Sequence, residues 1–250
     1  MEKIIQKIKS NPYVSILFAI LLGWGVILIS KIVATPLAHL IGNEISLNFY
    51  TQNVIFKFIL LLFSIATILL INKGKLKNYG FALPESFKFI KTTLITIGII
   101  VASIIVGYII FILILGHLFP TTNHTGFPEA QSLFQLFLTA WVWSSICEEV
   151  WVRGLVQSFI QHINFKIFRL SIPVIISGLL FGSMHLMLFS AGMGVWNVCA
   201  LVLFATATGI LAAYFREKTK SLIPAIWVHF VANVVGYLPL IIMAIINLLK

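Results

Sequence analysis

Three charged residues interrupt a long apolar run at Glu148-Glu149-Val150-Trp151-Val152-Arg153. Without them, the surrounding residues 131–162 read as a membrane-spanning segment. A charge near the centre of a bilayer costs roughly 2.5–3.5 kcal/mol on insertion scales, so three cost about 8–10 kcal/mol before any pairing. Packing does not require such a cost, and ionisable residues at this depth mark functional sites. The stretch therefore predicts a membrane protein and the position of its site.

Helix spacing separates the two glutamates of this stretch. Glu149 and Arg153 are four residues apart, on one helix face and in the favourable order for an ion pair. Glu148 and Arg153 are five residues apart, about 140° around the helix axis. We therefore expect Arg153 to neutralise Glu149, whereas Glu148 needs partners from elsewhere in the chain.

The composition excludes a soluble protein. Of the 250 residues, 60% are hydrophobic and 10% are charged, against about 25% charged in soluble domains. We predict an all-α, polytopic transmembrane helical bundle that forms one integral membrane domain over residues 1–250. Residues 1–130 would hold helices without a signature, and residues 131–249 would form the catalytic core in the last four helices. Seven spans are expected, or eight if the piece after Pro239 is separate, from apolar runs near residues 13–34, 53–72, 89–116, 131–162, 170–189, 195–215 and 222–249.

The net charge of +10 indicates topology and not nucleic-acid binding. If the N-terminus is cytoplasmic, most of the 17 basic residues fall in cytoplasmic segments, as the positive-inside rule requires. The Ile-, Lys- and Asn-rich, Asp-free composition leads us to expect a bacterial plasma membrane. Membrane lipid is then an expected partner, and nucleic acid is not.

Polar residues in three later positions are candidate partners of Glu148. His185 lies inside the run 170–189, and His229 and Asn233 share one face of the last run because they are four residues apart. Counted at about 1.5 Å per residue from the cytoplasmic helix ends, Glu148 and His185 are both about 21–22 Å deep, His229 is about 12 Å deep and Asn233 about 18 Å deep. Three helices can thus direct these side chains at one cavity.

This set of side chains suits the hydrolysis of an amide. Glu148 can act as a general base on water, and His185 can share that water or protonate the leaving amine. His229 and Asn233 can stabilise an oxyanion. A zinc site with Glu148, His185 and His229 as ligands is the alternative; we favour the metal-free water mechanism, with no cofactor, and zinc remains open.

Three motifs resemble those of a known family of membrane proteases. The stretches Glu148-Glu149-x-x-x-Arg153, Phe181-x-x-x-His185 and His229-x-x-x-Asn233 resemble the signature motifs of the CPBP intramembrane proteases, also called the Abi or CAAX-protease family. That family includes the type II CAAX prenyl endopeptidases and is often labelled metalloprotease. The order, spacing and membrane context of the motifs all match.

The resemblance implies a glutamate-dependent membrane protease. By position, it assigns Glu148 as the catalytic carboxylate, His185 as its partner on the water, His229 and Asn233 as transition-state donors, and Glu149 and Arg153 as supporting residues. The implied substrates are leader, pheromone or bacteriocin-like peptide precursors, or C-terminally lipidated proteins. A non-enzymatic membrane immunity or regulatory protein of the same family is the alternative, and a proton-relay transporter is a weaker one.

Overall fold

The structure, a computed structural model, describes residues 2–42, 49–84, 86–121, 132–238 and 241–242. About 82% of the described residues are helical, and the strands among them form one short hairpin of β1 (Lys166–Ile167) and β2 (Leu170–Ser171). The predicted all-α class is therefore confirmed. The helical elements are α1 (Glu2–Lys9), α2 (Pro12–Gly42), α3 (Phe49–Ile71), α4 (Phe89–Gly107), η1 (Tyr108–Leu115), α5 (Gly116–Leu118), α6 (Leu133–Leu136), η2 (Phe137–Trp143), α7 (Ser144–Glu149), η3 (Val150–Gln157), α8 (Ser158–Ile160), α9 (Ile172–Met184), η4 (His185–Ala191), α10 (Val195–Thr219) and α11 (Ile223–Gly236).

Five helices in the described ranges are long and apolar enough to cross a membrane. They match five of the predicted runs: Pro12–Ile41, Tyr50–Ile71, Phe89–Leu118, Ile172–Ala191 and Val195–Thr219. The last predicted run contains a shorter apolar helix, α11, and Pro239 with the piece after it lies outside the described residues apart from 241–242. The chain is thus a helical integral membrane protein, and the count of seven or eight spans remains a prediction.

The helix that carries the charged stretch lies at the centre of the bundle. It continues from Leu133 to Ile160 through α6, η2, α7, η3 and α8. At 1.5 Å per residue it is roughly 42 Å long, longer than the ~30 Å hydrocarbon core of a bilayer. Two of its segments, η2 and η3, are π-helical and flank α7, which bears both glutamates. Wider π turns inside an α-helix are frequent at functional sites.

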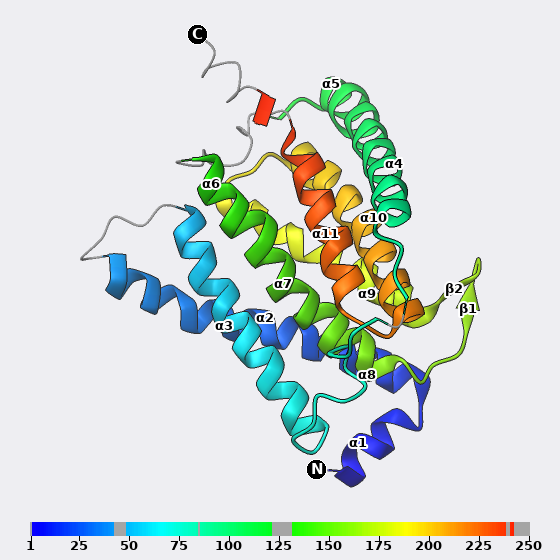
Figure 1. Cartoon of the computed structure of the whole chain (residues 1–250). Helices are drawn as coiled ribbons and strands as arrows, with labels where there is room; N and C mark the ends of the chain where they lie inside the picture. Colours follow the sequence, from blue (N-terminus) through cyan, green and yellow to red (C-terminus); the bar gives the residue numbers. More distant parts are fainter. Residues whose placement is uncertain (1, 43–48, 85, 122–131, 239–240, 243–250) are drawn as a thin grey trace.

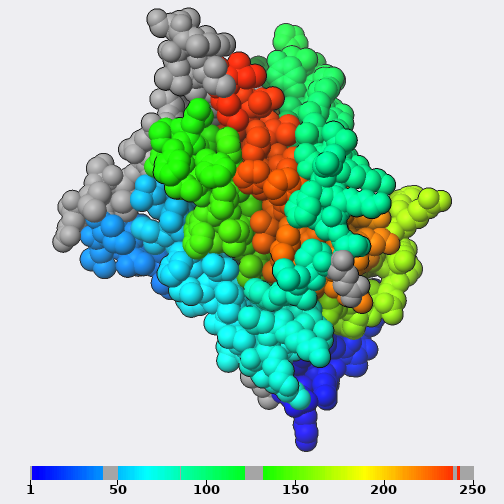
Figure 2. Space-filling view, viewed as in Figure 1, coloured from blue at the N-terminus to red at the C-terminus, as the bar shows by residue number. Residues whose placement is uncertain are grey.

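The other helices surround this central helix on two sides. In Figure 1, α2 and α3 lie on one side of α7, and α11, α10 and α4 lie on the other. Figure 2 shows, from the same direction, α11 between the central helix and α4. Most large side chains of α4 are exposed, as expected for a helix that faces lipid. The arrangement surrounds the two glutamates with helices from both halves of the chain.

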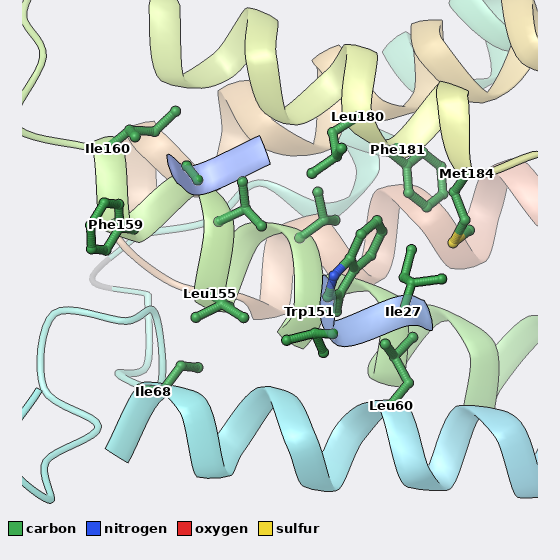
Figure 3. Close-up of a cluster of buried hydrophobic side chains, with 14 of the residues drawn as sticks. Ile27, Leu60, Ile68, Trp151, Leu155, Phe159, Ile160, Leu180, Phe181 and Met184 are labelled. Carbon is green, nitrogen blue, oxygen red and sulfur yellow. The ribbon is translucent and has the colours of Figure 1, made fainter. Parts of the chain in front are cut away.

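A buried apolar cluster fixes the central helix against α2, α3 and α9. Figure 3 shows Trp151 at its middle, with Ile27 of α2, Leu60 of α3 and Leu180 of α9 around it. The Trp151 indole Nε1 donates a hydrogen bond of 3.0 Å to the Gly23 carbonyl oxygen of α2. This bond satisfies the one polar atom of a large side chain that is otherwise wholly buried.

Small residues bring α9 and α10 into close contact. A Cβ added at Gly178 of α9 would lie 2.5 Å from Ile210 Cγ1 and 2.8 Å from the Ile210 backbone nitrogen. At Gly209 of α10, an added Cβ would lie 2.9 Å from the Gly178 carbonyl oxygen. The backbones therefore touch where only glycine leaves room. This contact fixes the position of α9, and His185 is the residue that directly follows the end of α9.

Candidate active site

The predicted ion pair between Glu149 and Arg153 is present and completely buried. Arg153 Nη1 lies 2.9 Å from Glu149 Oε1, and both side chains are 0% exposed. Arg153 Nη2 donates to the Gly209 carbonyl oxygen of α10 at 2.7 Å, and its guanidinium lies 4.7 Å from the centre of the Phe181 ring. The pair therefore links the central helix to α9 and α10.

His229 of α11 lies between the two glutamates. Its Nδ1 is 2.9 Å from Glu149 Oε1, and its Nε2 is 3.7 Å from Glu148 Oε2. An ionised carboxylate only accepts hydrogen bonds, so Nδ1–H is the donor in the bond to Glu149. Glu149 thus fixes the imidazole ring, and the Phe181 ring packs edge-on against it at 5.0 Å. The ring orientation that results directs Nε2 at Glu148.

Glu148 has a partner that the sequence analysis missed. Lys57 of α3 forms a salt bridge through Nζ with Glu148 Oε1, and both residues are about 5% exposed. The sequence did contain a signal for this residue, because Lys57 is a single lysine inside the apolar run 53–72. A charged residue within a membrane span is costly and therefore marks a functional position. The prediction that Glu148 faces away from Arg153 and takes its partner from elsewhere is confirmed, with Lys57 and His229 as those partners.

His185 presents one ring nitrogen to the cavity as an acceptor. Its Nδ1 is 3.1 Å from the Phe181 carbonyl oxygen. A carbonyl oxygen can only accept, so Nδ1 carries the hydrogen and Nε2 of the neutral imidazole carries the lone pair. The described contacts include no direct hydrogen bond between His185 and Glu148, although both line one cavity. A water molecule between them fits this arrangement.

Asn233 uses its amide hydrogens within the protein. Its Nδ2 donates to the Ala140 carbonyl oxygen at 2.9 Å and to Ser145 Oγ at 3.3 Å. Both acceptors lie on the central helix, so Asn233 ties α11 to the helix that carries Glu148. In this geometry the side chain of Asn233 offers the cavity an acceptor, and the predicted role as an oxyanion donor would require one of these bonds to open.

A cavity of about 710 Å³ connects these side chains. Its wall contains the four predicted catalytic residues and Lys57, contributed by α3, α7, η4 and α11. A further part of its wall, from α4, η1 and α10, is largely apolar and includes Ile104, Ile105 and Leu201. A polar cluster together with an apolar wall is typical of a pocket for a ligand that is partly apolar.

The donor atoms do not fit a zinc site in this arrangement. Among the described residues, no group of three or more His, Cys, Asp or Glu side chains is placed to hold a metal ion. The Lys57 ammonium contacts Glu148 Oε1, an oxygen for which a zinc ion bound by Glu148 would compete. An ammonium in contact with a candidate ligand opposes a divalent cation electrostatically. No step of the chemistry below is therefore assigned to a metal.

The comparison with known families agrees with these motifs. Residues 130–235 match the family model described as "Type II CAAX prenyl endopeptidase Rce1-like". The match supports a family of the CAAX-protease, or CPBP, type for this region, as its three motifs predict. The matched region contains all six predicted site residues, whereas Lys57 lies outside it. No curated protein and no solved structure matches the chain.

Proposed function

We propose that this protein is an intramembrane endopeptidase that hydrolyses a peptide bond with water activated by Glu148. The main support is the arrangement of the buried Glu148 carboxylate, which contacts Lys57 and His229. It lines one cavity together with His185, whose Nε2 is a hydrogen-bond acceptor. A general base needs hydrogen-bonding reach to the proton that it removes, and a water in the cavity between the two side chains meets that need. The family match of the same region supports a peptidase.

The proposed reaction adds one water molecule across the peptide bond. Glu148 takes a proton from water while the water oxygen attacks the carbonyl carbon, and the π electron pair moves to the carbonyl oxygen. Collapse of the tetrahedral intermediate breaks the C–N bond, and the amine leaves with the proton from Glu148. His185, whose Nε2 accepts, holds the second hydrogen of the water and aligns its oxygen.

The remaining predicted residues position this pair. Glu149 orients His229 through Nδ1, and Arg153 balances the charge of Glu149. His229 then faces Glu148 with Nε2, and when both ring nitrogens are protonated this Nε2–H can donate to the developing oxyanion. Asn233 holds α11 at the correct distance from the central helix through Ala140 and Ser145. We propose that the reaction requires no metal or other cofactor.

The proposed substrates are membrane-associated peptides. The apolar wall from α4 and α10 suits the apolar part of a leader, pheromone or bacteriocin-like precursor, or a C-terminal lipid. The site lies within a helical bundle with long apolar spans, so a substrate would reach it from the bilayer or its interface. We further propose a bacterial plasma membrane with the N-terminus in the cytoplasm.

Isotopic labelling of the products tests the hydrolysis directly. Purified protein in detergent would be incubated with prenylated and unprenylated peptides in water enriched in oxygen-18, and fragments would be analysed by mass spectrometry. We expect fragments with one oxygen-18 in the new C-terminal carboxylate, and none with the Glu148→Gln variant. Intact peptides throughout, together with full biological complementation by Glu148→Gln, would instead support a non-enzymatic immunity or regulatory protein.

A further inference from the structure

We infer that Lys57 is a positioning residue for catalysis, which holds Glu148 as a carboxylate and directs its second oxygen at the reacting water. This inference rests on the proposed function. Lys57 lies in α3, outside the region that matches the family model and outside all three motifs. The protease site of this chain would therefore be completed by its N-terminal half.

The contact is specific to one oxygen of the carboxylate. Lys57 Nζ binds Glu148 Oε1, and Oε2 is left facing His229 Nε2 at 3.7 Å and the cavity. A carboxylate with one oxygen occupied by an ammonium has its rotation restricted, which fixes the direction from which the other oxygen accepts a proton. Orientation of this kind is a large part of what an active site contributes to rate.

The charges of the cluster require Lys57. Arg153 is committed to Glu149 by the contact at 2.9 Å and to Gly209 by its other nitrogen. Of the Lys and Arg side chains in the described cluster, Lys57 is therefore the one that balances Glu148. A carboxylate buried among apolar helices without a cation would be strongly disfavoured as an ion, and only the ionised form can act as a general base.

The Lys57 ammonium also balances the negative charge of the cavity during the reaction. When Glu148 takes the proton of water, its charge disappears and a negative charge develops on the substrate carbonyl oxygen. The Lys57 ammonium then faces a neutral acid next to a new oxyanion, so the net charge of the cavity stays constant. A fixed positive charge near developing negative charge lowers the barrier most effectively where water is excluded.

The position of α3 is itself fixed relative to Glu148. Trp143, at the end of η2 and just before α7, donates from Nε1 to the Val54 carbonyl oxygen at 3.3 Å. Its ring stacks on Phe58 at 6.4 Å, so Trp143 contacts α3 on both sides of Lys57 in sequence. The Lys57 side chain also passes its own neighbour, with Nζ 5.1 Å from the Phe56 ring. The structure thus holds Lys57 and Glu148 together from both helices.

The test compares steady-state kinetics of purified variants on one cleaved peptide. Lys57→Met should lower kcat about 100-fold with little change in KM, because the loss concerns orientation and charge rather than substrate binding. Lys57→Arg, which keeps the cation, should recover most of the rate. Lys91→Met removes an exposed lysine of α4 and serves as the matched control with unchanged kinetics.

Chemical rescue separates a positioning role from a structural one. Lys57→Ala should regain kcat when ethylammonium is added, because Lys57 lines the cavity and a small amine can enter the vacated space. Propanol, of similar size and uncharged, should not restore activity. If Lys57→Met is poorly folded, the double variant Lys57→Met/Glu148→Gln, which removes both charges, should recover its thermal stability.

Two outcomes would be decisive against the inference. Wild-type kcat in Lys57→Met, with Glu148→Gln inactive, would overturn the role of Lys57 and leave the proposed protease intact. Equal rescue of Lys57→Ala by propanol would reduce Lys57 to a space-filling residue. Full activity of Glu148→Gln would instead overturn the proposed function itself, so the two failures are distinguishable.

Discussion

A close backbone contact between α9 and α10 gives a quantitative test of the fold. In Gly178→Ala, the new methyl group would lie 2.5 Å from Ile210 Cγ1 and 2.8 Å from the Ile210 backbone nitrogen. The side-chain atom can rotate away, but the backbone atom cannot, so α9 and α10 must separate. Because His185 follows the last residue of α9, the separation should also displace His185 from the cavity.

The expected cost of Gly178→Ala follows from two opposing terms. Overpacking costs about 1–3 kcal/mol, and replacing glycine by alanine in a helix gains up to about 1 kcal/mol. Gly98→Ala in α4 is the matched control, because an added Cβ there meets nothing within 4 Å. The helix term is common to both variants, so the difference between their free energies of unfolding isolates the clash, about 1–3 kcal/mol.

The assay measures reversible unfolding of both variants in the same detergent, together with kcat on a cleaved peptide. Gly178→Ala should be less stable than Gly98→Ala by the stated difference and should show reduced kcat. Gly98→Ala should match wild type or exceed it in stability, with unchanged kcat. Equal stability of the two variants would refute the close backbone contact between α9 and α10.

Three further predictions concern the ion pair, the helix start of α9 and the metal. Arg153→Met should lower the free energy of unfolding in detergent by about 3–5 kcal/mol, because it removes the arginine that neutralises the buried Glu149 carboxylate. A loss no larger than that of the exposed-site variant Lys166→Met would contradict this. Ser171→Ala should cost about 1 kcal/mol in the same measurement, because Ser171 Oγ accepts from the Val174 N–H at the start of α9. Peptide cleavage should survive a strong chelator, and its loss with recovery on added zinc would revive a site of Glu148, His185 and His229.

Much of the fold follows from the sequence because a bilayer leaves few options. Five apolar runs predicted to span are helices of suitable length. The hairpin β1–β2 and the π-helical turns around α7 were not predicted. Such features depend on which backbone hydrogen bonds form locally and on tertiary contacts, and hydrophobic periodicity encodes neither.

The candidate site was predictable where it rests on spacing within one helix. The four-residue separation of Glu149 and Arg153 predicts their ion pair. The same separation of His229 and Asn233 predicts that both side chains lie on one helix face. Pairing between helices that are distant in the sequence could not be predicted from such spacing. Lys57 and Glu148 lie on different helices, and no local pattern relates them. The fixed amide of Asn233 likewise depends on Ala140 and Ser145, which carry no sequence signal.

The most direct test of the central claim is the single-turnover cleavage rate of Glu148→Gln against wild type on the same membrane peptide. Glu2→Gln, which removes a carboxylate exposed on α1 and paired with Lys73, is the matched control. The account predicts wild-type rates for Glu2→Gln and a loss of at least about 100-fold for Glu148→Gln, the contribution expected of a general base. A Glu148→Gln protein that cleaves at the wild-type rate would contradict it.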